Sequence, residues 1–263
     1  MAALAGRLGI VSDSDREQRL VFGEIAQQYE AFRPSYPHEL FDTIIDFGDL
    51  HAGDRALEIG AGTGKATVAF VARGLDVHAL EPSPGMAAVL RGKGIEAEET
   101  LFEEWDPGAS GGFQLVYAAQ AWHWVRGDDR YDRVAAALRP GGTVAFFWNK
   151  GRDWTGSLGA DNDAAYARLA PEMSNAQWQL DWVADGIDAC ALLGPPTRRI
   201  VTWTQPYSRV EWERLLGTHS DHRILPDEQR ARLHTAVGDV IDRHGGHVEV
   251  VYDVEIFLSR RVG

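Results

Sequence analysis

The feature that most restricts the fold of this chain is a set of three glycines at alternate positions, Gly60, Gly62 and Gly64. The apolar run at 55–60 predicts a buried strand, and residues 65–73 predict a helix that follows the glycines. Because glycine lacks a Cβ, a turn of this kind lets the backbone approach a ligand closely and lets the helix pack near the strand. The segment therefore predicts a ligand-binding strand–turn–helix unit.

An acidic residue ends the next predicted strand. Glu81 lies about 20 residues after Gly60, where a carboxylate can accept hydrogen bonds from both hydroxyls of a ribose. A dinucleotide fold uses the spacing G-x-G-x-x-G and places a pyrophosphate at the helix N-terminus. Here the spacing is G-x-G-x-G followed by Lys65, and Glu58 would lie unfavourably close to a pyrophosphate. The loop therefore favours a cationic ligand without phosphate, such as S-adenosylmethionine (SAM), over a nicotinamide dinucleotide.

The rest of the chain alternates strands and helices up to Asn149. Such alternation is typical of a parallel sheet covered by helices on both faces. Predicted strands lie at 55–60, 76–81, 95–98, 113–118 and 143–148, and again at 198–204 and 247–258. We therefore expect an α/β fold, a doubly wound, Rossmann-like, seven-stranded sheet with a helical insertion after strand five.

This pattern divides the chain into four parts. We expect an N-terminal helical cap (1–50), a cofactor-binding Rossmann-like core (51–149), a helical insertion that covers the substrate (150–196), and a C-terminal part of the core with the last two strands and helices (197–263). Within the cap, a helix is predicted at 18–32, ended by the proline-rich turn at 33–37.

Composition restricts the partners. The formal net charge is −13, with 39 acidic against 26 basic residues, which disfavours nucleic acids and anionic membranes. Cys190 is the single cysteine, so an intrachain disulfide is excluded. Two H-x-x-H pairs occur at 219–222 and 244–247, but no cysteine or E-x-x-H pattern supports either pair as a metal site. The N-terminus lacks the apolar run of a signal peptide. We expect a cytoplasmic monomer or homodimer that holds no metal and acts on a small molecule.

Several motifs occur in a fixed order along the chain. They are LEIGAGTGKAT (57–67), LEPSPGM (80–86), FEEWDP (102–107), AAQAWHWV (118–125), LRPGG (138–142) and FFWN (146–149), with YEAFRPSYP (29–37) upstream and GTHS (217–220) and the segment 245–261 downstream. In this order they resemble the class I SAM-dependent methyltransferases of the type 11 group, and most of all the small-molecule branch that includes trans-aconitate methyltransferase relatives. The resemblance covers nearly the whole chain.

The resemblance implies roles for individual residues. Glu81 matches the acid that binds the ribose, Glu58 the residue that holds the SAM amino group, and Tyr29 and Arg33 the residues that reach the methionine carboxylate. The adenine would lie near Phe102 and Glu103, where many family members have D-A-E and this chain has TLFE (100–103). The remaining expected cofactor contacts are Gly60, Ala61, Gly62, Pro82, Met86 and Gln120.

The aromatic segment after the fourth strand is the expected acceptor side, at the carboxyl edge of the sheet where open α/β folds bind ligands. Methyl transfer mainly needs alignment and exclusion of water, and a base only when the acceptor must lose a proton. His123 is the candidate base, or it only hydrogen-bonds the backbone or SAM and shapes the pocket. Trp122 and Trp124 either stack on the acceptor or pack the wall. Trp148 and Trp154 complete the expected substrate contacts and favour an apolar or aromatic acceptor.

The expected function is transfer of a methyl group from SAM to a small molecule, with S-adenosylhomocysteine (SAH) as the product. Two alternatives remain open at this point. One is an NAD(P)-dependent oxidoreductase, which would need the dinucleotide glycine spacing. The other is a SAM-binding protein without a catalytic role, which would bind SAH but methylate no acceptor. A macromolecular methyltransferase is disfavoured by the acidity and by the lack of an N/D-P-P-Y motif.

Overall fold

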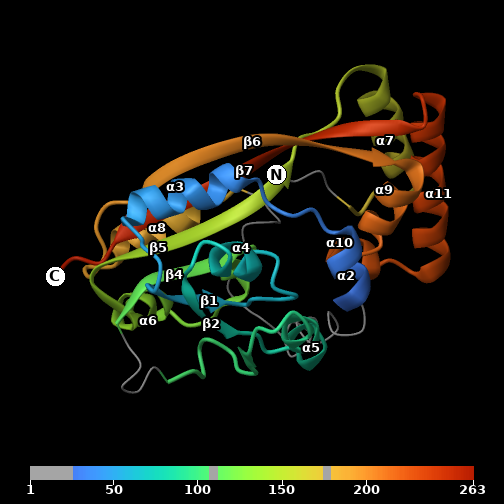
Figure 1. The fold of residues 1–263 in the computed structure, drawn as a ribbon. Coiled ribbons are helices and arrows are strands. Elements are labelled where there is room, and N and C mark those ends of the chain that lie inside the picture. The colour runs from blue at the N-terminus through green and yellow to red at the C-terminus, as the bar shows by residue number, and fades with distance from the viewer. Residues whose placement is uncertain (1–25, 107–111, 174–178) are drawn as a thin grey trace.

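The fold is built on one seven-stranded sheet. The computed structural model describes residues 26–106, 112–173 and 179–263 (Figure 1). The strands are β1 (Arg55–Ile59), β2 (Asp76–Leu80), β3 (Ala97–Glu98), β4 (Phe113–Ala119), β5 (Leu138–Gly151), β6 (Thr197–Ser208) and β7 (His247–Arg260). They lie in the order β3-β2-β1-β4-β5-β7-β6, with β7 antiparallel to both of its neighbours. The predicted seven-stranded, Rossmann-like α/β sheet is confirmed.

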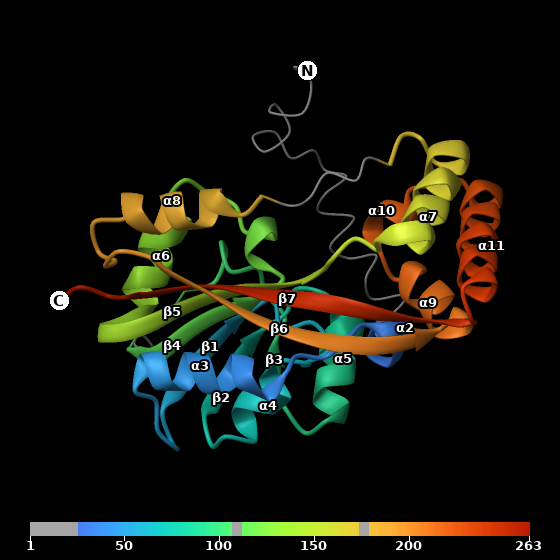
Figure 2. The same cartoon turned by 90° about the horizontal axis from the view of Figure 1, so that it is seen from above.

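Helices cover both faces of this sheet. They are α2 (Ala26–Phe32), α3 (His38–Gly48), α4 (Thr67–Val71), α5 (Pro84–Gly92), α6 (Arg130–Ala137), α7 (Gly156–Leu169), α8 (Asp181–Ala189), α9 (Arg209–Leu216), α10 (Ser220–Arg223) and α11 (Asp227–Arg243), with the 3₁₀ helix η3 (Trp122–Trp124). Figure 2 shows α3 and α4 on one side of the sheet and α6 and α8 on the other.

The two faces follow from the alternation of side chains along each strand. In β4, Leu115 and Tyr117 belong to the apolar cluster that includes α3 and α4, whereas Val116 and Ala118 belong to the cluster that includes α6 and α8. All four side chains are buried. A strand buried on both faces reads as a continuous apolar run, which is how β4 appears in the sequence.

The outer strands extend beyond the inner ones and carry a second layer of helices. β4 ends at Ala119, opposite Phe147, but β5 continues to Gly151 and β6 and β7 continue further still. Helices α7, α9 and α11 pack on this overhang around a separate apolar cluster that includes Leu233 and Val237. We call α7, α9, α10, α11, the segment 217–219 between α9 and α10, and the overhanging ends of β6 and β7 the cover lobe. Figures 1 and 2 show its helices grouped at one end of the sheet.

The structure divides the expected insertion 150–196 between two places. Helix α7 joins the cover lobe, but α8 packs on the core sheet, because Val183 and Ile187 are buried beside α6. The other cover helices come from the segment between β6 and β7, within the part expected to complete the core. The strand expected at 143–148 begins earlier, at Leu138, and its pairing with β4 is irregular near that end.

The N-terminal part contributes α2 and α3, and the expected helix at 18–32 lies partly outside the described residues. Within the described part of the chain, no helix combines the length and the apolar character that crossing a membrane requires.

Candidate active site

A cavity of about 780 Å³ lies between the carboxyl ends of the inner strands and the cover lobe. The loop after β1 contributes Gly60 and Gly62, the end of β2 contributes Glu81, and the end of β4 contributes Gln120. The cover lobe contributes His219. This is the edge at which open α/β sheets bind ligands, beside the point where the strand order reverses between β1 and β4.

The three glycines of the loop have different roles. All three have positive φ angles, which residues with a side chain rarely adopt. A Cβ on Gly60 would lie 2.6 Å from the Cβ of Ala121, and one on Gly64 would overlap Leu90 of α5, so these two glycines are required for packing. A Cβ on Gly62 would meet no atom within 4 Å, and Gly62 lines the cavity. Gly62 is therefore the glycine that leaves room for a ligand.

Glu81 is held at the edge of the cavity by two backbone amides. The amide of Gly62 donates to Oε2 at 2.7 Å, and the amide of Ser83 donates to Oε1 at 2.8 Å. The residue is only 6% exposed, and this burial raises the pKa of its carboxyl group to about 7, although both amide hydrogen bonds oppose the rise. Each oxygen keeps lone-pair capacity for a further donor, which suits a pair of hydroxyl groups.

Arg33 connects the end of α2 to the cover lobe. Its Nη2 donates to the carbonyl oxygen of Thr218 at 3.0 Å, and its guanidinium lies 5.4 Å from the ring centroid of Tyr29. Both Arg33 and Tyr29 line the cavity. An arginine fixed by one of its N–H groups in this way can bind a carboxylate with the others.

Gln120 follows β4 in a left-handed backbone conformation, with φ of 55°. Residues with a side chain seldom adopt this conformation, and it is concentrated at functional sites. The backbone amide of Gln120 donates to the backbone carbonyl of Phe147 at 2.9 Å and holds the residue in this conformation. The short helix η3 begins directly after this bend and brings His123 and Trp124 to the cavity wall.

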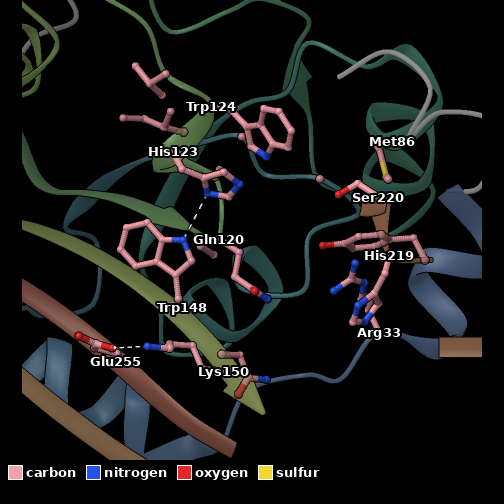
Figure 3. A pocket seen from close by; sticks show the side chains of 18 of the residues that line it. Arg33, Met86, Gln120, His123, Trp124, Trp148, Lys150, His219, Ser220 and Glu255 are labelled. Carbon is pink, nitrogen blue, oxygen red and sulfur yellow. Dashed lines mark hydrogen bonds and ion pairs between the residues drawn. The ribbon is translucent and has the colours of Figure 1, made fainter. Parts of the chain in front are cut away.

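His123 lies between two tryptophans. Figure 3 shows its ring between Trp124 and Trp148, and the indole Nε1 of Trp148 donates to His123 Nδ1 at 3.3 Å. Trp124 and Trp148, both expected to contact the acceptor, also line the cavity. Trp122 does not, because it is fully buried and stacks on Phe146 with ring centroids 4.1 Å apart.

Trp154 also lies away from the main cavity. Its ring packs against Trp212 at 5.1 Å in the cover lobe and lines a smaller neighbouring hollow of about 240 Å³. The expected acceptor contacts therefore divide into two that line the main cavity and two that do not.

The part of the cavity wall next to Trp148 on β5 and β7 is charged. Lys150 of β5 pairs with Glu255 of β7 at 3.3 Å (Figure 3), and Arg152 makes two hydrogen bonds to Asp253, at 2.7 and 2.8 Å. Arg198 of β6 also pairs with Glu255. These charged pairs were not predicted from the sequence. The available signal was that Asp253 and Glu255 occupy alternate positions within an apolar stretch of the predicted strand, which places both side chains on one face.

Ten of the twelve expected cofactor contacts line the cavity. They are Tyr29, Arg33, Gly60, Gly62, Glu81, Pro82, Met86, Phe102, Glu103 and Gln120. Ala61 instead packs in a small apolar cluster with Leu90, and Glu58 is fully buried beneath the loop.

Glu58 points away from the cavity because of strand alternation. It shares a face of β1 with Ala56, toward α3 and α4, and accepts hydrogen bonds from Thr67 Oγ1 at 2.5 Å and from the Tyr117 hydroxyl at 2.8 Å. Burial raises the pKa of its carboxyl group to about 8. The structure therefore places Glu58 where it supports the loop from below rather than where it touches a ligand in the cavity.

Histidines of the cover lobe lie close together without forming a metal site. His222 Nδ1 lies 3.0 Å from His234 Nε2, and His222 Nε2 lies 3.2 Å from the Tyr166 hydroxyl. Burial lowers the pKa of His219 well below its ordinary value. Among the described residues, no group of three or more His, Cys, Asp or Glu side chains is arranged to hold a metal ion.

Comparisons with known proteins agree with this geometry. Residues 56–142 match the family model described as a methyltransferase domain. An uncharacterized methyltransferase of Mycobacterium tuberculosis is 34% identical over 209 residues, which are 77% of this chain and 74% of that protein. The chain belongs to the class I SAM-dependent methyltransferase family.

Solved methyltransferase structures share the fold. A putative type II methyltransferase from Anaeromyxobacter dehalogenans superposes with a TM-score of 0.61 at 22% identity, over 88% of this chain and 99% of that one. Phosphoethanolamine N-methyltransferase 2 of Haemonchus contortus, solved with phosphomonomethylethanolamine and SAH, gives a TM-score of 0.54 at 15% identity, over 97% of this chain and 61% of that one. At sequence identities this low, the structural similarity shows that this chain has the methyltransferase fold and does not show which acceptor it uses.

Proposed function

We propose that this methyltransferase binds SAM in the main cavity and transfers its methyl group to a small-molecule acceptor, leaving SAH. The observation that carries the proposal is the Glu81 carboxylate, fixed by the amides of Gly62 and Ser83 beside the open space at Gly62. A carboxylate held in this way accepts hydrogen bonds from the two ribose hydroxyls of a nucleoside.

The lining residues fit the other parts of SAM. Arg33 offers N–H groups to the methionine carboxylate, and Met86 and Phe102 provide apolar surface for the adenine. A dinucleotide fits less well, because the loop offers no cation to a pyrophosphate. Lys65 turns away and donates to the carbonyl oxygen of Glu30 at 2.8 Å.

Bound SAM supplies an electrophilic methyl group, which an acceptor lone pair attacks while the carbon–sulfur bond breaks and its electrons stay on sulfur. The protein aligns the acceptor and excludes water. The acceptor contacts the aromatic side chains of Trp124 and Trp148 and the neighbouring charged pair of Lys150 and Glu255, so it has both apolar and polar surface. The net charge of −13 supports a small molecule over a nucleic acid.

Isothermal titration calorimetry tests the cofactor. We expect SAM and SAH to bind and NAD not to bind, and we expect Glu81→Ala to weaken SAH binding by at least about tenfold, since it removes two charge-assisted hydrogen bonds. Glu98→Ala is the matched control, because Glu98 is an exposed carboxylate on β3 that pairs with His78 outside the cavity. Preferential NAD binding, or unchanged SAH affinity in Glu81→Ala, would refute the proposal.

The transfer itself is tested with SAM labelled on its methyl group. The purified protein is incubated with the low-molecular-weight fraction of a cell extract, and in parallel with its protein and nucleic-acid fractions. We expect the label to enter the small-molecule fraction. Label confined to macromolecules, or no transfer in any fraction despite SAH binding, would contradict the proposed activity.

A further inference from the structure

We propose that Trp148 holds His123 in the tautomer with the proton on Nε2, so that His123 acts toward the acceptor as a hydrogen-bond donor and not as a general base. The role toward an acceptor rests on the proposed function. The tautomer itself is a property of the protein alone and can be measured without a ligand.

The hydrogen bond between the two rings decides the tautomer. The indole N–H of Trp148 is a donor only, and its partner is Nδ1 of His123 at 3.3 Å. Nδ1 must therefore present a lone pair. A neutral imidazole carries one proton, so that proton is on Nε2.

Trp148 is firmly placed to impose this state. It is 2% exposed on β5, and its ring packs edge-on against Trp182 at 6.2 Å and Phe257 at 6.1 Å. Its backbone lies opposite Glu255 in the β5–β7 ladder. Burial and these packed rings hold the indole in the position from which its N–H donates to His123.

His123 is equally restricted from its own side. It lies in η3, where the amide of Trp124 donates to the Ala121 carbonyl at 2.9 Å and the amide of Val125 donates to the Trp122 carbonyl at 3.1 Å. Trp122 fixes this turn in the core through its stack on Phe146. Trp122 therefore fixes the backbone at His123, and Trp148 of β5 holds the imidazole ring through its hydrogen bond.

This arrangement opposes general-base catalysis. The one lone pair on the neutral ring is engaged by Trp148, and Nε2 already carries a proton. To take a proton from an acceptor at Nε2, the ring would first have to move its own proton to Nδ1. With the proton on Nδ1, the N–H group of His123 would face the indole N–H of Trp148, and the hydrogen bond between the two rings would be lost.

A hydrogen-bond donor at this position selects a class of acceptor. It suits a molecule that presents an anionic or carbonyl oxygen at or beside its nucleophilic atom, and whose nucleophile has no proton to lose. In the transfer, the nucleophile's lone pair forms the bond to the methyl carbon, the carbon–sulfur electrons stay on sulfur, and no proton moves to His123. His123 is then a binding residue for the acceptor, and Trp148 a positioning residue.

Nitrogen NMR of protein labelled with ¹⁵N-histidine tests the tautomer, with the His123 signals assigned by their loss in His123→Gln. We expect wild-type His123 to show a protonated Nε2 and an unprotonated Nδ1 at neutral pH. Trp148→Phe keeps an aromatic ring but removes the N–H, and we expect it to increase the Nδ1-protonated or doubly protonated share of His123.

Trp203→Phe is the matched control. This variant also removes an indole N–H, one that donates to Oδ1 of Asn149, the residue after Trp148 on β5, at 3.0 Å. We expect it to leave the His123 signals unchanged. A wild-type His123 protonated at Nδ1, or signals unchanged in a folded Trp148→Phe variant, would overturn the proposal.

A second measurement does not depend on the variant being folded. In wild-type protein labelled with ¹⁵N at both tryptophan and histidine, we expect a scalar coupling across the hydrogen bond between Trp148 Nε1 and His123 Nδ1, and its absence counts against the proposal. SAH calorimetry on the same samples keeps the two proposals apart. Failure to bind SAH would refute the proposed function while leaving the tautomer assignment standing.

Discussion

Glu81 makes cofactor affinity depend on pH. Burial raises the pKa of its carboxyl group to about 7, and only the carboxylate accepts hydrogen bonds from both ribose hydroxyls without a competing proton. Deprotonation is therefore largely complete by pH 8 and slight at pH 6. We expect SAH affinity, measured by calorimetry, to rise about tenfold from pH 6 to pH 8 and then to level off.

Glu81→Gln isolates this effect, because the amide keeps the shape of the side chain but does not titrate. Glu58, with a pKa of about 8, titrates in the same range beneath the loop and is unchanged in the variant. His219 lines the cavity, but burial holds its pKa low, so it stays neutral throughout. Affinity that falls with pH, or an equally steep rise in Glu81→Gln, would show that Glu81 is not the responsible group.

Single residues were predictable where their role is set by near neighbours in the sequence. Glu81 and Gly62 lie one strand apart and meet through one backbone hydrogen bond, so the motif predicts their proximity. Glu58 was harder to place, because its burial depends on which face of β1 its side chain takes. Trp122 was harder to place because its burial depends on how η3 packs against Phe146. The pair Arg198 and Glu255 joins β6 to β7, and no local pattern fixes that register.

At the scale of elements, the loop after β1 depends on its fit to α5. Gly64 has a φ of 87°, and a Cβ there would overlap Leu90 of that helix. We expect Gly64→Ala to lower the free energy of unfolding by about 2–4 kcal/mol, because backbone strain and overpacking add. Denaturant unfolding followed by circular dichroism measures the change.

Gly92→Ala is the control for that variant. Gly92 ends the same helix, has no positive φ, and a Cβ there would meet nothing within 4 Å. Alanine is the better helix former, so this variant should be as stable as wild type or slightly more stable. A Gly64→Ala variant no less stable than Gly92→Ala would mean that the loop can move away from α5 without cost.

The order and type of most elements were predictable, because a buried parallel strand and an amphipathic helix differ in the period of their apolar residues. The allocation of helices to layers was not. Helices α7 and α8 follow each other in the chain, but one packs with α11 on the cover lobe and the other on the core sheet. That choice depends on how far β5, β6 and β7 extend beyond β4, which the alternation of residues does not encode.

At the scale of the whole molecule, the cavity belongs to two layers that meet across it. The core sheet supplies the loop at 60–64 and Glu81, and the cover lobe supplies residues 219–221. The hydrogen bond from Arg33 to the Thr218 carbonyl connects the α2 side to that lobe. A ligand that fills the cavity contacts both layers, so its binding energy is shared between segments far apart in the sequence.

Because both layers line the cavity, cofactor binding should protect segments of both from hydrogen exchange. A ligand that binds only the folded state stabilises the segments it contacts, and at about 100 times its Kd it can slow their opening by up to about a hundredfold. We expect saturating SAH to slow hydrogen exchange, measured by mass spectrometry, in peptides covering 60–64 and in peptides covering 217–221. Peptides from α8 should not change beyond any global effect, because none of its residues lines the cavity. The Glu81→Ala variant should lose both protected segments together at the same SAH concentration. Protection confined to the glycine loop would mean that the cover lobe does not close the cofactor site, and that the acceptor reaches the cavity from that side.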